Sequence, residues 1–586
     1  MKIAIAQINT CEGDFIQTAN KMEKVALEAQ ELGAEFIVFP LPVLTGPLAG
    51  VLASTDEFLF DTLNTFANLA NTLTIPALVP VASDIDDDSV YDVALVANGS
   101  VSPLRLASVI DEIVDDEQLP SIPSNFAPIA FSLGDLDFGI VFNQEGLSAY
   151  AESSADADVV IYLSGLGFDN DEVLSNLSPS ITSGYFKTEA QRTDSWIMGI
   201  GGIGGYAEQV FSGGSFVMAP TGDLVYAAPL FEEDLSVVDI NLDVPVASMD
   251  KVEVPEYDRV EYLTHAIDLA IKEFCIKQNK HKVVVPLYGD MSSACLVTLA
   301  ARAQGFRNVV GVVPSFVVGD ALEDALTLAR KLDIDVEIPD LGDKYDVGLI
   351  PLFLAEFSQA IGGVILVTDD KTSLALEPDK HEVRCVRSYA PFGDVYKSDV
   401  LAMASKMSVI DKSILDRFDI PEVEGFPSTS DKTDLISQID AILYLHIEQD
   451  EGVTSIATKQ KNEVLTSSVI GKMRAGDYAR RFMPIMPIVS SRTLAECEYP
   501  IGIAWSDRTR DDFDADEFKD LQQHLLNMMD DTSDNSQQLP INIETKIASN
   551  AHPGDLDDLL GHIMGALQTT MPDDDMVDGL NLFSNN

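Results

Sequence analysis

Residues 282–314, KVVVPLYGDMSSACLVTLAARAQGFRNVVGVVP, carry the strongest fold signal in the chain. They read as an apolar strand (282–287), a short turn, a helix (292–304) and a second apolar strand (308–314). Two strands joined by a helix within about 35 residues are typical of a parallel βαβ unit. Such folds place phosphate groups at the turn after the first strand, because the helix N-terminus that follows attracts anions.

The first 245 residues also alternate between strands and helices. Apolar strands are predicted over 2–8, 35–40, 77–82, 91–98, 138–142, 158–163 and 214–219, and an amphipathic helix over 18–32. This pattern predicts a layered α/β domain over 1–245. A stretch with mixed charge over 246–257 reads as a linker, and a second α/β domain follows over 258–505.

The charge of the chain excludes several classes of partner. Its 586 residues include 37 Lys and Arg against 95 Asp and Glu, a formal net charge of −58, although 46% of residues are hydrophobic. That hydrophobic content indicates a globular protein rather than a disordered acidic chain. Nucleic acids and anionic membrane surfaces are excluded as partners, since both are bound through clusters of Lys and Arg.

The last 81 residues differ in composition from the rest. Residues 506–586 hold 18 acidic and 4 basic residues and are predicted to be an acidic C-terminal extension. Two interpretations stay open for this extension, a solvated tail and a docking arm for a partner.

Cysteine usage and hydropathy indicate the compartment. The five cysteines show no CxxC spacing: Cys11, Cys275, Cys295, Cys385 and Cys497. This argues against a disulfide framework and a cysteine-rich zinc site, so no metal site is predicted from side-chain spacing. No apolar run approaches the roughly 18 residues that a membrane span needs. We expect a cytoplasmic protein without a membrane anchor.

Seven segments occur in an order that resembles one family. Those in the first half resemble the nitrilase, or carbon–nitrogen hydrolase, superfamily: AQINTCEGDF (6–15), FIVFP (36–40), LTG (44–46) and VFSGGSFVMAPTGD (210–223). Those in the second half resemble the NAD synthetase domain: APFGDVYKSDVLAMA (390–404), YARRFMP (478–484) and YPIGIAW (499–505). Over residues 1–505 the chain therefore resembles the glutamine-dependent NAD(+) synthetases.

This resemblance implies both a fold and an activity. The expected fold is α/β, with a nitrilase-like α-β-β-α sandwich followed by a Rossmann-like, parallel-sheet NAD synthetase domain of the adenine nucleotide alpha hydrolase type. In that family the first domain hydrolyses glutamine with a Cys nucleophile, a Glu base and a Lys. The second domain uses ATP and Mg²⁺ to amidate nicotinic acid adenine dinucleotide with the ammonia that is released.

The three glutaminase positions implied by the resemblance are occupied by other residues. The Glu position is Leu41, the Lys position falls near Ala107, and the Cys position is Asn143. Amide hydrolysis by this route needs a thiolate and a base that generates it. An Asn carboxamide is not nucleophilic and a Leu side chain accepts no proton, so the sequence predicts that glutaminase activity is absent.

The SGGxDS loop of the family corresponds to residues 288–293. Gly289 and Ser293 match this motif, whereas Tyr288, Asp290 and Ser292 depart from it. Phosphate loops need small residues so that backbone N–H groups approach the oxygens. A like-charge pair about 4 Å apart costs about 4 kcal/mol at an effective dielectric constant of about 20, so Asp290 opposes a phosphate. A Mg²⁺ ion that bridges Asp290 to phosphate reverses this sign, and this alternative stays open.

Seven further positions retain the family residue. They are Pro314, Ser315, Lys371, Gly393, Asp394, Lys397 and Arg481. Their functional interpretation is contact with a nucleotide or dinucleotide. Their structural interpretation is a turn at Gly393-Asp394 and an ion pair or cap made by Lys397 within the fold.

Three hypotheses about function follow. The leading one is an inactive member of the family, a pseudoenzyme that acts as a scaffold or regulatory subunit in a homo-oligomer or a hetero-oligomer with an active NAD synthetase. The second is an ammonia-dependent NAD synthetase with a remodelled ATP site. The third is a sensor that binds a nucleotide or dinucleotide weakly without turnover. No cofactor is assigned from the residues themselves; ATP and Mg²⁺ are implied only by the family.

Overall fold

The computed structural model describes most of the first 500 residues. The described residues are 1–41, 43–46, 52, 55–82, 91–97, 99–105, 129–152, 156–170, 177–206, 208–245, 251–254, 258–339, 349–378, 387–425, 431–500, 505 and 509. The chain divides into two compact units, Met1–Glu451 with Val464–Ser506 and Gly452–Glu463 with Asp507–Asn586. Ala107, most of the predicted linker and nearly all of the predicted acidic extension lie outside the described residues.

Two six-stranded sheets form the first half of the chain. One has the order β14-β1-β2-β3-β4-β5 and the other β13-β12-β9-β8-β7-β6. The strands of the first sheet are β1 (Lys2–Gln7), β2 (Phe36–Val38), β3 (Ala77–Ala82), β4 (Tyr91–Ala97), β5 (Ser100–Arg105) and β14 (Asp234–Asp239). Those of the second are β6 (Ile129–Leu133), β7 (Leu136–Val141), β8 (Val159–Ser164), β9 (Trp196–Gly201), β12 (Phe216–Met218) and β13 (Leu224–Ala227).

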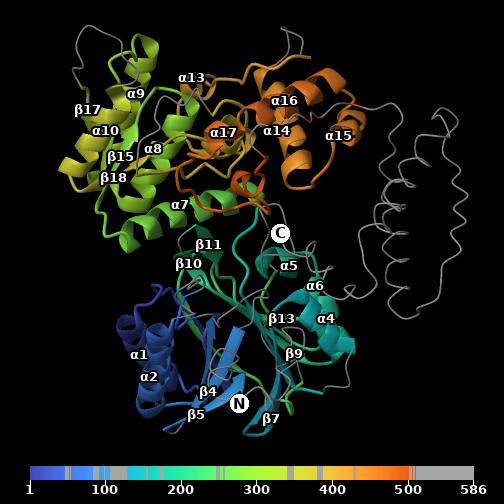
Figure 1. The fold of residues 1–586 in the computed structure, drawn as a ribbon. Coiled ribbons are helices and arrows are strands. Elements are labelled where there is room, and N and C mark those ends of the chain that lie inside the picture. The colour runs from blue at the N-terminus through green and yellow to red at the C-terminus, as the bar shows by residue number, and fades with distance from the viewer. Residues whose placement is uncertain are drawn as a thin grey trace, which may run out of the picture. The chain divides into compact units, whose positions relative to one another are not determined.

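The alternation of side chains along each strand builds four layers. Ile3 and Ile5 of β1 lie in the core between the two sheets, whereas Ala4 and Ala6 face the opposite side. Helices α1 (Phe15–Glu31) and α2 (Asp56–Thr72) cover that outer face. The outer face of the second sheet is covered by α4 (Gln144–Glu152), α5 (Leu177–Thr182) and α6 (Tyr185–Thr193), as Figure 1 shows. The predicted α-β-β-α sandwich is confirmed.

A five-stranded sheet of order β17-β16-β15-β18-β19 forms the second half. Every strand pair in it is parallel. Its strands are β15 (Lys282–Pro286), β16 (Val309–Val312), β17 (Asp335–Glu337), β18 (Gly363–Leu366) and β19 (Ser388–Tyr389). The helices of this half are α7 (Arg259–Lys277), α8 (Met291–Gln304), α9 (Asp320–Leu332), α10 (Leu349–Ala360), α11 (Lys371–Leu376), α12 (Lys397–Lys406), α13 (Lys412–Leu415), α14 (Lys432–Ile447), α16 (Glu463–Ala475) and α17 (Asp477–Arg480), and α15 (Val453–Gln460) belongs to the second unit. The predicted parallel-sheet domain is confirmed.

The strand order of this sheet determines where a site can form. The chain passes from β15 to β16 and β17 on one side, and then returns to β18 on the other side of β15. The segments that leave β15 and β18 therefore run in opposite directions and leave a crevice at the carboxyl ends of the two strands.

Contacts between the two halves run through α7 and the hairpin of β10 (Ile203–Tyr206) and β11 (Gln209–Ser212). Lys277 of α7 donates a hydrogen bond to the Gly205 carbonyl at 2.7 Å, and its ammonium lies 3.4 Å from the centre of the Tyr206 ring. Asn9 also donates to Glu273 at 2.6 Å. None of the helices in the described part of the chain is long and apolar enough to cross a membrane.

Candidate functional site

A cavity of about 640 Å³ lies at the carboxyl ends of β15 and β18. Six of the described residues that line it carry a carboxylate: Asp290, Asp369, Asp370, Glu377, Asp419 and Glu422. Lys397 supplies the single ammonium group among these described lining residues. We refer to it as the acidic cavity.

Asp290 caps the helix that follows the phosphate loop (288–293). Its Oδ1 atom accepts hydrogen bonds from the backbone N–H of Ser293 at 2.9 Å and from the Ser293 hydroxyl at 2.5 Å. A side-chain oxygen at this position satisfies one of the free N–H groups of α8 and stabilises its first turn. Helix α8 therefore begins at Met291, one residue before the predicted start. The carboxylate occupies the helix N-terminus at which a phosphate would otherwise bind.

The environment of Asp290 is unfavourable for a second anion. Burial raises the pKa of the Asp290 carboxyl, and the hydrogen bonds from Ser293 offset only part of this rise. Nearby Lys397 also lowers the pKa, whereas Asp419 raises it through charge repulsion. A bound phosphate would add to the same repulsion.

The rest of the loop is held by its own contacts. Gly289 has a φ of +71°, and a Cβ atom there would lie 2.1 Å from the Ala321 carbonyl oxygen, so only glycine fits. The Tyr288 N–H donates to the Ser293 hydroxyl at 3.2 Å. The Tyr288 ring stacks on Phe316, with 6.1 Å between the ring centres. Gly289 and Ser293 thus support the loop, whereas Tyr288, Asp290 and Ser292 line the acidic cavity.

Lys397, which supplies the ammonium group of the acidic cavity, already forms an ion pair within the protein. The Lys397 ammonium lies 3.0 Å from Oδ2 of Asp370. Burial lowers the pKa of Lys397, but the surrounding carboxylates, Asp370 first, raise it by more. Asp370 also accepts a hydrogen bond from the Ser373 N–H at 2.8 Å and so caps α11. The positive charge that a triphosphate requires is therefore largely neutralised by the protein itself.

The buried carboxyl of Asp440, which the sequence did not single out, contacts the residues next to Lys371 and Lys397 in the chain. Asp440 accepts hydrogen bonds from the Thr372 hydroxyl at 2.6 Å and from the Ser398 N–H at 2.8 Å. Burial raises the pKa of Asp440 to about 7. An aspartate in the middle of α14 carries no sequence signal that distinguishes it from a surface acid.

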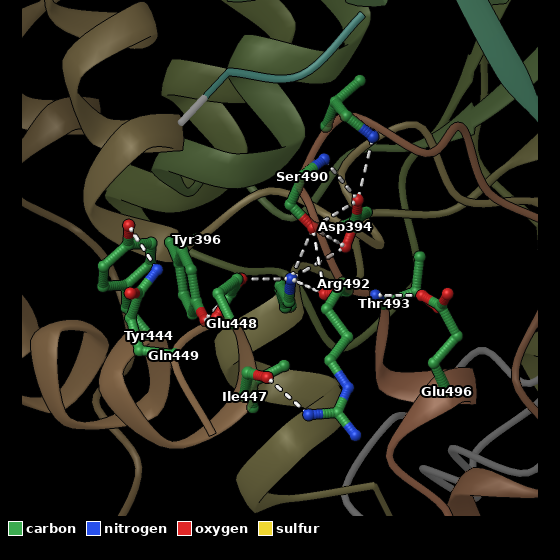
Figure 2. A network of polar contacts seen from close by, with 12 residues as sticks. Asp394, Tyr396, Tyr444, Ile447, Glu448, Gln449, Ser490, Arg492, Thr493 and Glu496 are labelled. Carbon is green, nitrogen blue, oxygen red and sulfur yellow. Dashed lines mark hydrogen bonds and ion pairs between the residues drawn. The ribbon is translucent and has the colours of Figure 1, made fainter. Parts of the chain in front are cut away.

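Lys371 and Asp394, both predicted to contact a nucleotide, lie in a separate buried network. The Lys371 ammonium is fully buried, 2.6 Å from Oε1 of Glu448 and 3.0 Å from Oδ1 of Asp394. Asp394 accepts hydrogen bonds from the backbone and hydroxyl of Ser490, each at 2.9 Å. Figure 2 shows this cluster, with the Tyr396 hydroxyl donating to Glu448 at 2.7 Å. Neither Lys371 nor Asp394 lines the acidic cavity.

The other retained positions also lie outside the lining of the cavity. Pro314 is buried and Ser315 is exposed where the chain leaves β16. At Gly393 a Cβ atom would lie 2.7 Å from the Met486 sulfur, so a glycine is needed for packing. Arg481 pairs with Asp477 at 3.2 Å. Of the seven retained positions, the described structure brings only Lys397 into the cavity; the nucleotide contacts of the others stay predictions.

Two of the three glutaminase positions are described. Leu41 follows β2 and is buried in the apolar core between the two sheets. Asn143 follows β7, and its Oδ1 atom accepts a hydrogen bond from the Gly146 N–H at 2.7 Å, at the first turn of α4. These contacts give both side chains a structural role.

The cavity does not fit the ATP and Mg²⁺ that the family resemblance implies. The Asp290 carboxylate takes the anion position of α8, and Lys397 is paired with Asp370. Among the described residues, no group of three or more His, Cys, Asp or Glu side chains is arranged to hold a metal ion. A magnesium ion held by one or two carboxylates together with substrate phosphates needs no such group, and it is the one arrangement in which Asp290 would attract a nucleotide complex.

The sequence of the chain was compared with those of known proteins. No family model matches it. The glutamine-dependent NAD(+) synthetase of Thermotoga maritima is 23% identical over 567 residues, which cover 85% of this chain and 97% of that protein.

Two solved structures share the fold. The glutamine-dependent NAD(+) synthetase of Acinetobacter baumannii, in complex with ADP, has a TM-score of 0.59 at 20% identity and covers 86% of this chain and 99% of its own. The glutamine-dependent NAD(+) synthetase of Cytophaga hutchinsonii has a TM-score of 0.65 at 12% identity, covering 86% and 98%. Over about 85% of its length, the chain is similar to the glutamine-dependent NAD(+) synthetases, at 23% to 24% identity.

Proposed function

We propose that this chain is a catalytically inactive homologue of the glutamine-dependent NAD(+) synthetases that serves as a scaffold or regulatory subunit. The observation that carries the proposal is the Asp290 carboxylate at the N-terminus of α8. This carboxylate lies at the helix N-terminus that, by the family resemblance, corresponds to the position of the ATP phosphates, and in its ionised form it repels them. With about 4 kcal/mol of repulsion, nucleotide affinity falls on the order of a thousandfold.

The first half supports the same conclusion through different chemistry. Leu41 has no group that takes a proton, and the Asn143 amide is committed to the first turn of α4. Loss of the nucleophile alone costs an acyl-transfer enzyme on the order of 10⁶ in rate. Without glutamine hydrolysis the chain would depend on free ammonia, which the second half could use only with bound ATP.

The intact cores support a role for the folded shape. Each sheet of the first half is covered on both faces, and the parallel sheet has a continuous core of its own. We infer that a homologue whose sites have changed while its layers remain packed is retained for its folded shape. The partner that fits this role is another copy of the chain or an active NAD synthetase.

Catalysis is tested by direct assay. The purified chain is incubated with ATP, Mg²⁺ and nicotinic acid adenine dinucleotide, with either glutamine or ammonia, and NAD is measured. We expect no NAD above background, with the Thermotoga maritima enzyme as the positive control. NAD formation that persists through further purification and is lost in Lys397→Met would overturn the proposal in favour of an ammonia-dependent synthetase.

The scaffold role is tested by assembly. Light scattering gives the mass of the pure chain in solution, and affinity purification from the native host identifies proteins that stay bound. We expect either self-assembly or recovery of an active NAD synthetase. A monomer that recovers no synthetase would contradict the scaffold role, whatever the activity assay gives.

A further inference from the structure

Two carboxylates of the acidic cavity have no partner in the described structure. Asp290 and Asp370 cap helices, and Glu377 pairs with Lys472 at 2.9 Å. Asp419 and Glu422 are exposed at the cavity wall, and the side chain of neither forms an ion pair or hydrogen bond with another described residue. Their charge is therefore available to a ligand.

Two buried hydroxyl groups point to a ligand independently of these acids. Ser292 is 8% exposed and Ser373 is 9% exposed, and both line the cavity. Neither hydroxyl hydrogen-bonds to any other described residue. Both oxygens stay accessible from the cavity, so the two hydroxyls are available to the hydrogen-bonding groups of a ligand.

Aromatic rings add a surface that suits a cation. Tyr288 and Phe316 stack on one another at the cavity wall, and Phe418 lines it from the segment that carries Asp419. The face of an aromatic ring attracts ammonium groups and also covers hydrocarbon. A ligand that carries both ammonium groups and hydrocarbon therefore gains binding affinity from these aromatic rings.

The size of the cavity and the spacing of its acids define the ligand further. A volume of about 640 Å³ lies in the range of small-molecule sites. A compact metal ion is disfavoured, because the described acids form no group arranged to hold one. Acids distributed along a wall match a molecule whose charges are spaced along a chain.

We propose that the acidic cavity binds a linear organic polycation of the polyamine class. Ammonium groups pair with Asp419 and Glu422 and donate hydrogen bonds to the Ser292 and Ser373 hydroxyls, and the methylene chain packs on Tyr288 and Phe316. The site goes beyond the proposed scaffold role, because it gives a subunit without turnover a small molecule to sense.

Titration calorimetry of the full chain with spermidine tests this site. We expect one saturable site, with binding weakened about tenfold or more in the double variant Asp419→Asn/Glu422→Gln. Ser292→Ala/Ser373→Ala weakens binding as well, without changing the charge. Butylamine, which carries one charge, binds far more weakly than spermidine.

The high net charge of the chain requires a matched control. Glu31→Gln/Asp156→Asn removes the same charge from exposed positions outside the cavity and should bind spermidine like the wild type. Equal weakening in both charge variants, or binding that never saturates, would mean general attraction to an acidic protein and would overturn the site. Displacement of spermidine by ATP at comparable concentration would overturn it in favour of a retained nucleotide site.

Discussion

The predicted glutaminase positions and the acidic cavity differ in the physical way in which each departs from the pattern that the family resemblance implies. At both, a side-chain oxygen satisfies a helix N-terminus: Asn143 in α4 and Asp290 in α8. At the position expected to hold the Glu base the pattern is altered by an apolar side chain, because Leu41 lies within the core between two sheets. Beside Asp290 a cavity of about 640 Å³ remains. A polar residue at the Leu41 position would have to be buried in an apolar core, whereas the charge of Asp290 can be removed by one substitution without repacking the core.

The strongest test of this difference is Leu41→Glu. If Leu41 is core, an unpaired carboxylate there destabilises the fold by several kcal/mol, on the order of the 3–5 kcal/mol seen for uncompensated buried charges. Urea unfolding gives the free energy directly. Leu41→Met is the control and should cost less than about 1.5 kcal/mol. If Leu41→Glu leaves the free energy of unfolding unchanged, the Leu41 position is open to water, and the proposed difference from the acidic cavity is wrong.

The second test removes the charge from the phosphate loop. The double variant Tyr288→Ser/Asp290→Gly should raise ATP affinity on the order of a thousandfold, because about 4 kcal/mol of repulsion disappears. Glycine at the cap costs the helix only a few tenths of a kcal/mol. Calorimetry with ATP and Mg²⁺ measures the gain, and Asp290→Asn, which removes only the charge, should recover most of it. No gain in either variant would show that the loop is altered by more than charge.

Asp440 makes stability depend on pH. Its pKa is raised to about 7 in the folded protein, so the folded state holds this proton more tightly than the unfolded state. The protonated Asp440 carboxyl therefore adds to the free energy of unfolding at low pH. This stabilisation is lost as pH rises toward 7, at a rate of at most about 1.4 kcal/mol per pH unit. Thermal unfolding of the wild type and Asp440→Asn between about pH 4 and pH 7, the interval between the unfolded-state and folded-state pKa of the carboxyl, measures the difference. Identical pH profiles would contradict the assignment.

The smallest expected effect concerns the cap at Asn143. Asn143→Ala should destabilise the protein by about 1 kcal/mol, since the Gly146 N–H loses its acceptor. Asn143→Asp keeps an acceptor and should stay close to the wild type. Asn143→Cys should hydrolyse no glutamine, because Leu41 provides no base. Glutamine hydrolysis by this single variant would place a base at this site that the contacts of Leu41 do not suggest.

The fold was predictable because its signals are local. The alternation of Ile3, Ala4, Ile5 and Ala6 defines two faces of a strand, and residues 282–314 contain a complete βαβ unit. Helix starts were less predictable. Asp290 extends α8 by one residue because its side chain caps the helix, and this depends on a turn geometry rather than on periodicity.

The site was predictable only in part, because its residues come from distant segments. Tyr288, Asp290 and Ser292 are adjacent in sequence, and their place in the cavity follows from the turn after β15. Lys371 was predicted to contact a nucleotide, but its charge is matched by Glu448, 77 residues away in the chain. No motif indicates such a pairing.

The sequence by itself determined the layers, because periodicity is a property of the chain. The order of the domains and the absence of the family's Cys, Lys and Glu at their expected positions stay predictions from the sequence. Only the tertiary structure decided which charges share a cavity and which are buried together. The acids of the loop after β15, the segment after β18 and residues 419–422 meet in one space. A side chain's solvation and partners depend on the packing of segments that are far apart in sequence.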